Sequence, residues 1–128
     1  MGSGPGTSRG HVLIVEDDLD TREALGAALE AEGYDVALAA HGREGLESLA
    51  TRPRPCLILL DLMMPVMDGV EFLGALESDP SLASIPVVVV SAYTTRAASL
   101  KVAGFLPKPI KLDRLLEWTE RYCGADRP

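Results

Sequence analysis

Short runs of consecutive apolar residues alternate along the chain with stretches in which apolar residues recur every three or four positions. The five runs are residues 12–15, 36–39, 56–60, 87–90 and 105–106. Because several neighbouring positions in each run are apolar, the runs are typical of strands that are buried on both faces. The pattern therefore predicts five strands separated by helices.

The stretches between the runs have the spacing of amphipathic helices. Asp20 precedes a Thr-Arg-Glu capping pattern, and Gly33 is expected to end the helix that follows. Further helices are expected over 43–50, 70–79, 95–102 and 111–122, of which 95–102 is short and polar. The side chains expected to face inward are Ala24, Leu25, Ala28, Leu29, Leu46, Leu49, Val70, Phe72, Leu73, Leu76, Leu112, Leu115 and Leu116.

Apolar strands that alternate with amphipathic helices favour a parallel sheet covered on both faces. Right-handed crossovers leave few ways to connect such strands. We therefore expect an α/β fold with a doubly wound five-stranded sheet, in the flavodoxin-like order 2-1-3-4-5, with a shortened fourth helix.

The composition indicates one globular domain. The chain has 128 residues, of which 47% are apolar, and this length suffices for a core without a disulfide or metal. We expect a flexible lead-in over 1–8, a folded domain over 9–123 and a tail over 124–128. A net charge of −7 disfavours nucleic acid and anionic membranes as partners.

The two cysteines are too few to indicate a disulfide framework. Cys56 is expected to be a small core residue and Cys123 a thiol near the tail, in a reducing compartment. Residues 1–8 lack the features of a signal peptide, and no apolar run is long enough to span a membrane. We therefore expect a cytoplasmic protein.

Polar residues with chemical potential follow the predicted strands. Glu16, Asp17 and Asp18 follow the first strand, Asp61 the third and Ser91 the fourth, while Lys108 lies beyond the fifth. The carboxyl ends of parallel strands meet at one edge, where ligands of such sheets bind. Converging carboxylates repel one another, and a hard divalent cation such as Mg²⁺ removes that cost. A carboxylate beside Mg²⁺ can act as a nucleophile toward phosphorus.

Four motifs in this order resemble the receiver domain of two-component response regulators, over about residues 10–123. They are Val-Glu-Asp-Asp at 15–18, Leu-Asp-Leu-Met-Met-Pro-Val-Met-Asp-Gly at 60–69, Ser-Ala at 91–92 and Lys-Pro at 108–109. The resemblance implies a phosphoacceptor that takes a phosphoryl group from a sensor histidine kinase or a histidine phosphotransfer protein. It further implies a Mg²⁺-dependent reaction and a conformational change that controls a downstream protein or an effector domain.

The resemblance also assigns roles to individual residues. Asp61 corresponds to the phosphoacceptor, Glu16 and Asp17 to the acidic pair that holds Mg²⁺, and Met63 to the position whose carbonyl completes the metal shell. Ser91 corresponds to the switch hydroxyl and Lys108 to the lysine that pairs with the phosphoryl group, with a cis bond to Pro109. Phe105 corresponds to a switch aromatic, although a plain core role remains open for it.

The segment between Ser91 and Lys108 is about five residues shorter than is usual in the family, which affects the region of the fourth helix. Two other functions stay open. A Mg²⁺-dependent phosphatase would use the same nucleophile, but such enzymes place a second Asp two residues on, where this chain has Met63. A receiver fold that no longer takes phosphate would be an interaction module and not an enzyme.

Overall fold

Five parallel strands form the centre of the molecule. The computed structural model describes residues 9–62, 69–91 and 101–124. The strands are β1 His11–Val15, β2 Asp35–Ala39, β3 Leu57–Asp61, β4 Val87–Ser91 and β5 Gly104–Pro107. They pair in the order β2-β1-β3-β4-β5. The predicted strand order is confirmed, and each predicted strand lies within one or two residues of its observed bounds.

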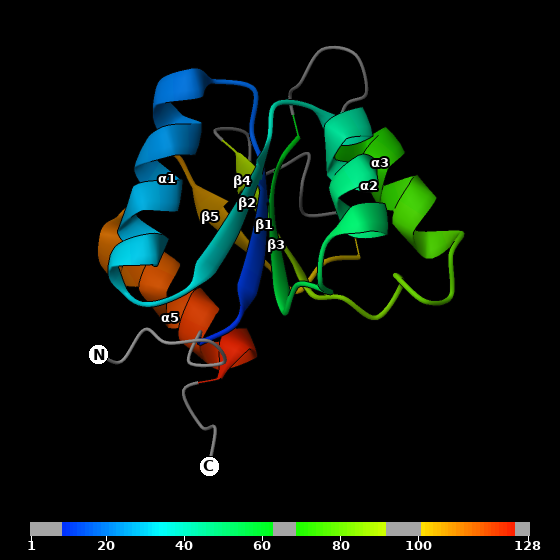
Figure 1. Cartoon of the computed structure of the whole chain (residues 1–128). Helices are drawn as coiled ribbons and strands as arrows, with labels where there is room; N and C mark the ends of the chain where they lie inside the picture. Colours follow the sequence, from blue (N-terminus) through cyan, green and yellow to red (C-terminus); the bar gives the residue numbers. More distant parts are fainter. Residues whose placement is uncertain (1–8, 63–68, 92–100, 125–128) are drawn as a thin grey trace.

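Helices cover both faces of the sheet. The described residues contain α1 Leu19–Ala31, α2 Gly42–Thr51, α3 Gly69–Glu77 and α5 Leu112–Cys123. Figure 1 shows α1 and α5 on one face and α2 and α3 on the other. Alternate residues of one strand therefore enter different cores: Ile14 packs with the α1 and α5 side chains, and Leu13 with those of α3.

Several predicted details differ from the structure. Val70 and Leu112 are 40% and 55% exposed, because each lies in the first turn of its helix, beyond the edge of the core. Ala24 is exposed as well. Asp18, not Asp20, caps α1: its Oδ2 accepts hydrogen bonds from the Thr21 backbone N–H at 2.9 Å and the Thr21 hydroxyl at 2.6 Å. Of the helix expected over 95–102, residues 95–100 lie outside the described residues, and 101–102 are not helical.

The indole of Trp118 packs directly on the backbone of β5. A Cβ atom on Gly104 would lie 2.2 Å from the Trp118 ring, so a side chain at this position would collide with it. Two ring contacts of the indole come from its own helix. The Tyr122 ring is stacked at a centroid distance of 6.2 Å, and the Arg121 guanidinium lies 4.9 Å from the indole centroid. The small residue at the start of β5 thus lets α5 lie close to the sheet.

The prediction for the two cysteines is wrong, because Cys56 and Cys123 form a disulfide. Cys56 precedes β3, Cys123 ends α5, and their Cα atoms are 5.3 Å apart. The fold brings these positions together although 67 residues separate them in the sequence. The residues that flank each cysteine in the sequence do not indicate the pairing, and the presence of only two cysteines argued against a disulfide.

Candidate functional site

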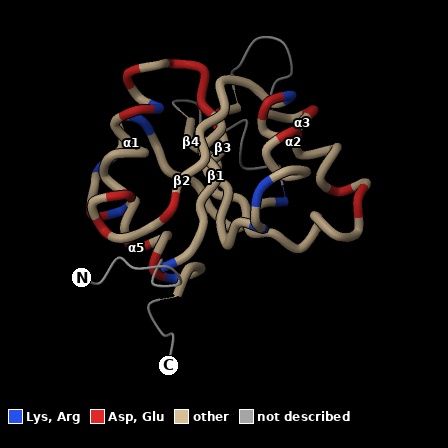
Figure 2. The backbone as a smooth tube through the Cα atoms, in the orientation of Figure 1, with Lys and Arg blue, Asp and Glu red and all other residues tan. Residues whose placement is uncertain are grey.

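Four of the predicted site residues lie at the carboxyl ends of the strands. Glu16 directly follows β1, Asp61 and Ser91 are the last residues of β3 and β4, and Lys108 directly follows β5. The parallel register places these ends together, since Asp61 pairs with Val90 and Ser91 with Pro107. Figure 2 shows acidic residues gathered on the connection from β1 to α1, which forms one side of this edge.

The centre of the site consists of two buried carboxylates and one lysine. The Lys108 Nζ atom lies 3.3 Å from Glu16 Oε1 and 3.8 Å from Asp61 Oδ2. Glu16 and Asp61 are 1% and 4% exposed, whereas the Lys108 side chain is 30% exposed. Buried carboxylates are costly unless they are paired, so the ammonium group stabilises both of them.

The connection after β1 is held in place by Arg22 of α1. Its guanidinium donates hydrogen bonds to the carbonyl oxygens of Glu16 at 2.9 Å and Asp17 at 3.3 Å. The Asp18 N–H in turn donates to Glu16 Oε2 at 3.1 Å. The hydrogen bonds from Thr21 lower the pKa of Asp18, because they favour the ionised cap. The acidic residues therefore have a fixed backbone, and Arg22 is a positioning residue that sequence reasoning missed.

Three carboxylates are close enough to share one cation. Glu16, Asp17 and Asp61 each offer an oxygen, and these three oxygens lie within 4.8 Å of one another. Asp17 is exposed, in contrast to the other two residues. The buried Glu16 Oε1 forms an ion pair with Lys108 Nζ at 3.3 Å and accepts no hydrogen bond from the described residues. Met63, the fourth predicted ligand, lies outside the described residues.

Gly69 allows α3 to begin against the end of β3. A Cβ atom at this position would lie 2.6 Å from Leu62 Cα and 2.9 Å from the Asp61 carbonyl oxygen. The Gly69 N–H donates a hydrogen bond to the Leu62 carbonyl at 3.0 Å. The sequence showed Gly69 only as part of a loop motif, and its close approach to Asp61 is visible only in the fold.

The connection after β5 brings Lys108 to the same edge. The peptide bond between Lys108 and Pro109 is cis, as predicted. The Lys108 N–H donates to the Ser91 carbonyl at 3.1 Å, which ties this connection to the end of β4. Ser91 is 4% exposed. Phe105 pairs with Val89 in the sheet and is half-buried against the core under α2 and α3.

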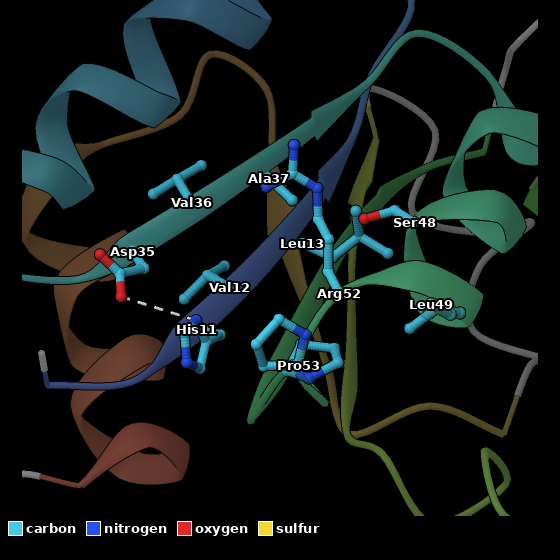
Figure 3. Close-up of a pocket in the computed structure, with 11 residues that line it drawn as sticks. His11, Val12, Leu13, Asp35, Val36, Ala37, Ser48, Leu49, Arg52 and Pro53 are labelled. Carbon is cyan, nitrogen blue, oxygen red and sulfur yellow. Dashed lines mark ion pairs between the residues drawn. The ribbon is translucent and has the colours of Figure 1, made fainter. Parts of the chain in front are cut away.

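A separate hollow lies at the other end of β1 and β2. Figure 3 shows the ion pair between His11 and Asp35 and, among the other lining side chains, Arg52, which directly follows α2. The His11 Nδ1 and Asp35 Oδ2 atoms are 3.6 Å apart, and their side chains are 41% and 61% exposed. None of the predicted site residues lines this hollow.

The parallel fold and the acidic edge with its lysine define a class of signalling domain. A profile of the response regulator receiver domain matches residues 12–120, so the chain belongs to this family. Receiver domains accept phosphoryl groups in two-component systems and typically use Mg²⁺ at an acidic pocket. Within the described residues, no helix is both long and apolar enough to cross a membrane.

Known relatives agree with this assignment. The chain is 39% identical to the response regulator MprA of Mycolicibacterium vanbaalenii over 82% of its own length, but spans only 46% of MprA. The receiver domain of a signal transduction histidine kinase from Syntrophus aciditrophicus superposes with a TM-score of 0.82, at 33% identity, covering 93% of this chain and 94% of that one. The receiver domain of the sensor histidine kinase PA1611 from Pseudomonas aeruginosa, solved with a magnesium ion in its active site cleft, also gives 0.82, at 27% identity over 91% and 98% of the chains.

Proposed function

We propose that Asp61 is the phosphoacceptor and that a histidine kinase or a histidine phosphotransfer protein is the donor. The observation that carries this proposal is the convergence of Glu16, Asp61 and Lys108 at one edge of the sheet. A nucleophilic carboxylate, a cluster of further acids and a fixed ammonium group are what phosphoryl transfer to aspartate needs.

The donor set suits magnesium. Glu16, Asp17 and Asp61 supply hard oxygen ligands, and the buried Glu16 Oε1 is compensated by its ion pair with Lys108 but accepts no hydrogen bond from the described residues. Asp17 is exposed and suits direct binding, while Glu16 suits contact through a water molecule; the Met63 carbonyl completes the proposed set. When bound, the ion offsets the repulsion between the carboxylates and the phosphoryl oxygens. The magnesium in the PA1611 receiver domain supports this proposal.

The side chains of this chain carry out the transfer. A carboxylate oxygen of Asp61 attacks the phosphorus of a phosphohistidine, a new O–P bond forms, and the N–P bond breaks to leave the imidazole of the donor. Lys108, held within 4 Å of Asp61, stabilises the charge on the transferred group. The Ser91 hydroxyl then binds a phosphoryl oxygen, and Phe105 changes its rotamer. Both changes shift the equilibrium between conformations of the connection after β5.

The product of the proposed transfer is an acyl phosphate on Asp61. Asp61 is 4% exposed, which restricts the approach of water. We propose slow hydrolysis at Asp61 and no turnover of external phosphate esters, because Met63 replaces the second acid that a phosphatase would need. The chain is thus a signalling domain that assists its own phosphorylation and dephosphorylation.

The donor docks beside Lys108. A groove between α1 and α5 is lined by Leu25, Ala28, Leu115 and Lys108, so it is continuous with the acidic site. Leu112 also lines this groove and is 55% exposed. An apolar helical surface that carries a phosphohistidine fits a groove of this chemistry. The target of the switched domain is a downstream protein or an effector domain. Residues 9–123 form the receiver domain, flanked by residues 1–8 and 124–128.

The cytoplasm is the proposed site of the reaction, because donors of phosphohistidine are loaded there from ATP. The net charge of −7 opposes binding to nucleic acid or to anionic lipid by this domain.

Phosphorylation by a small donor tests the proposal. The wild-type chain, incubated with acetyl phosphate and Mg²⁺, is expected to gain the mass of one phosphoryl group, and Asp61→Asn is expected to gain none. Asp20→Asn is the matched control, because Asp20 is an exposed acid in the first turn of α1. Equal labelling of the wild type and Asp61→Asn would overturn the assignment, as would labelling that is unaffected by a chelator of Mg²⁺.

A further inference from the structure

The disulfide lies at the edge of the sheet opposite the acidic site. Cys56 directly precedes β3, so it lies at the amino end of the strand whose carboxyl end is Asp61. Helix α5 ends at Cys123, and its last turn lies near the amino end of β3, at the lower side of the sheet in Figure 1. The two Cα atoms are 5.3 Å apart, a separation that suits a disulfide without movement of the backbone.

The chain that leads into β1 leaves room for this bond. Gly10 has a φ of 144°, a backbone conformation that favours glycine. Its backbone passes close to Cys56 and Cys123. A Cβ atom on Gly10 would lie 2.9 Å from Cys56 Sγ and 3.4 Å from Cys123 Cβ. A side chain at position 10 would therefore press on Cys56 Sγ.

The reduced form has a place for each thiol. Cys56 Sγ lies 3.3 Å from the His11 carbonyl oxygen, so a thiol at this position can donate a hydrogen bond to that oxygen. The backbone N–H of Cys56 already donates to the same carbonyl at 2.9 Å, which holds the residue whether or not the sulfurs are joined. Cys123 is 5% exposed and packs in the apolar core under α1 and α5, where a free thiol is well tolerated.

We propose that Cys56 and Cys123 form a reversible redox site for low-molecular-weight thiols and their disulfides. Cys56 is the half-buried member of the pair, so it is the sulfur that an external thiolate attacks. A bond forms between the external sulfur and Cys56 Sγ, and Cys123 leaves as a thiolate that takes up a proton. A second external thiol displaces Cys56, and two electrons have then passed from two small thiols to the protein. Oxidation runs through the same mixed disulfide in reverse.

Closing the bond ties the end of α5 to the start of β3. The bond closes a ring across 67 residues, which removes many conformations from the unfolded chain. We expect the oxidised form to melt roughly 5–15 °C above the reduced form, with both forms folded. The proposal does not rest on phosphate transfer, because the disulfide and the acidic site lie at opposite edges of the sheet.

Titration of the folded wild-type chain against glutathione redox buffers tests this proposal. After acid quenching and thiol alkylation, mass spectrometry is expected to show two alkylated cysteines in reducing buffer and none in oxidising buffer, with full reversal. In oxidised glutathione, Cys123→Ser is expected to form a mixed disulfide on Cys56 faster than Cys56→Ser forms one on Cys123. Gly10→Ala is expected to shift the midpoint toward the dithiol form.

Three outcomes would overturn the proposal. One is a wild-type chain that keeps two thiols in oxidising buffer. Another is a disulfide that glutathione opens only under conditions that unfold the chain, as followed by circular dichroism. The third is faster modification of Cys123 than of Cys56 in the two single variants.

Discussion

Replacement of Lys108 by methionine separates the two roles of its ammonium group. Methionine keeps most of the apolar stem of the side chain and removes the charge. Without the ammonium group, Glu16 and Asp61 remain buried at the same edge with less compensation, since Lys108 Nζ lies 3.3 Å and 3.8 Å from their oxygens. The variant should therefore be less stable without metal, and it should respond more strongly to Mg²⁺.

The size of the first effect follows from the two distances, and that of the second from an illustrative tenfold change in Mg²⁺ affinity. At an effective dielectric constant of about 20, attraction over 3.3 Å and 3.8 Å contributes about 5 and about 4 kcal/mol. Lys108 is 30% exposed and its desolvation opposes this attraction, so we expect a net loss of about 2–3 kcal/mol in the free energy of unfolding. For a site with a Kd of about 1 mM, roughly 10 mM Mg²⁺ stabilises the native state by about 1.4 kcal/mol, and a tenfold tighter site by about 2.7 kcal/mol.

Urea unfolding with and without Mg²⁺ measures both quantities. In the presence of a chelator, Lys108→Met is expected to be less stable than the wild type. Addition of Mg²⁺ is expected to raise its free energy of unfolding by about twice as much as that of the wild type. Lys101→Met is the control, because Lys101 is exposed and is not one of the residues around the carboxylates. If Lys108→Met matched the wild type in both conditions, the proposed competition between Lys108 and the cation would be wrong.

Three further predictions concern the scaffold. Gly69→Ala is expected to destabilise the fold by about 1–3 kcal/mol, because its Cβ would press on the backbone of Leu62. Gly74→Ala in the same helix is the control: its Cβ meets no atom within 4 Å, so it should stabilise the fold by about 0.5–1 kcal/mol. Equal unfolding midpoints of the two variants would refute this reasoning. Burial raises the pKa of Tyr34 above its ordinary value of 10.0, so the wild type should lose stability as the pH rises past about 10, and Tyr34→Phe should not show this loss in urea titrations. Hydrogen bonds from the Ser81 hydroxyl and backbone N–H lower the pKa of Asp79, so their stabilisation is present above the unfolded value of 3.8 and is lost as the pH falls through the lower folded value. Asp79→Asn keeps an acceptor that does not titrate, and thermal melts in acid should show a flatter dependence than the wild type.

The sequence was sufficient for the architecture because the strands are long apolar runs. Runs such as 57–60 and 87–90 are apolar throughout, so both faces of these strands must be covered by helices. The order of the strands then follows from general rules for parallel connections. The same logic placed Glu16, Asp61 and Lys108 at one edge, because the ends of parallel strands must meet there. The convergence of these three side chains therefore follows from topology alone.

Other features depend on distances that a pattern of residues does not contain. Leu112 continues the apolar stripe of α5 in the sequence, yet it is 55% exposed because the core ends before the first turn of the helix. The sequence pattern indicated Asp20 as the cap of α1, and only the hydrogen bonds from Thr21 show that the cap is Asp18. The pairing of Cys56 with Cys123 needed the meeting of β3 and α5, which no local signal reports.

The contact between Trp118 and Gly104 gives the chain an intrinsic optical probe. Trp118 is the one tryptophan in the sequence, so the emission spectrum of the protein reports the surroundings of a single ring. That ring rests on the first residue of β5, the strand that carries Phe105 and leads to Lys108. A displacement of β5 against α5 would change the polarity and the quenching at the indole, and it could be followed in solution without an added dye.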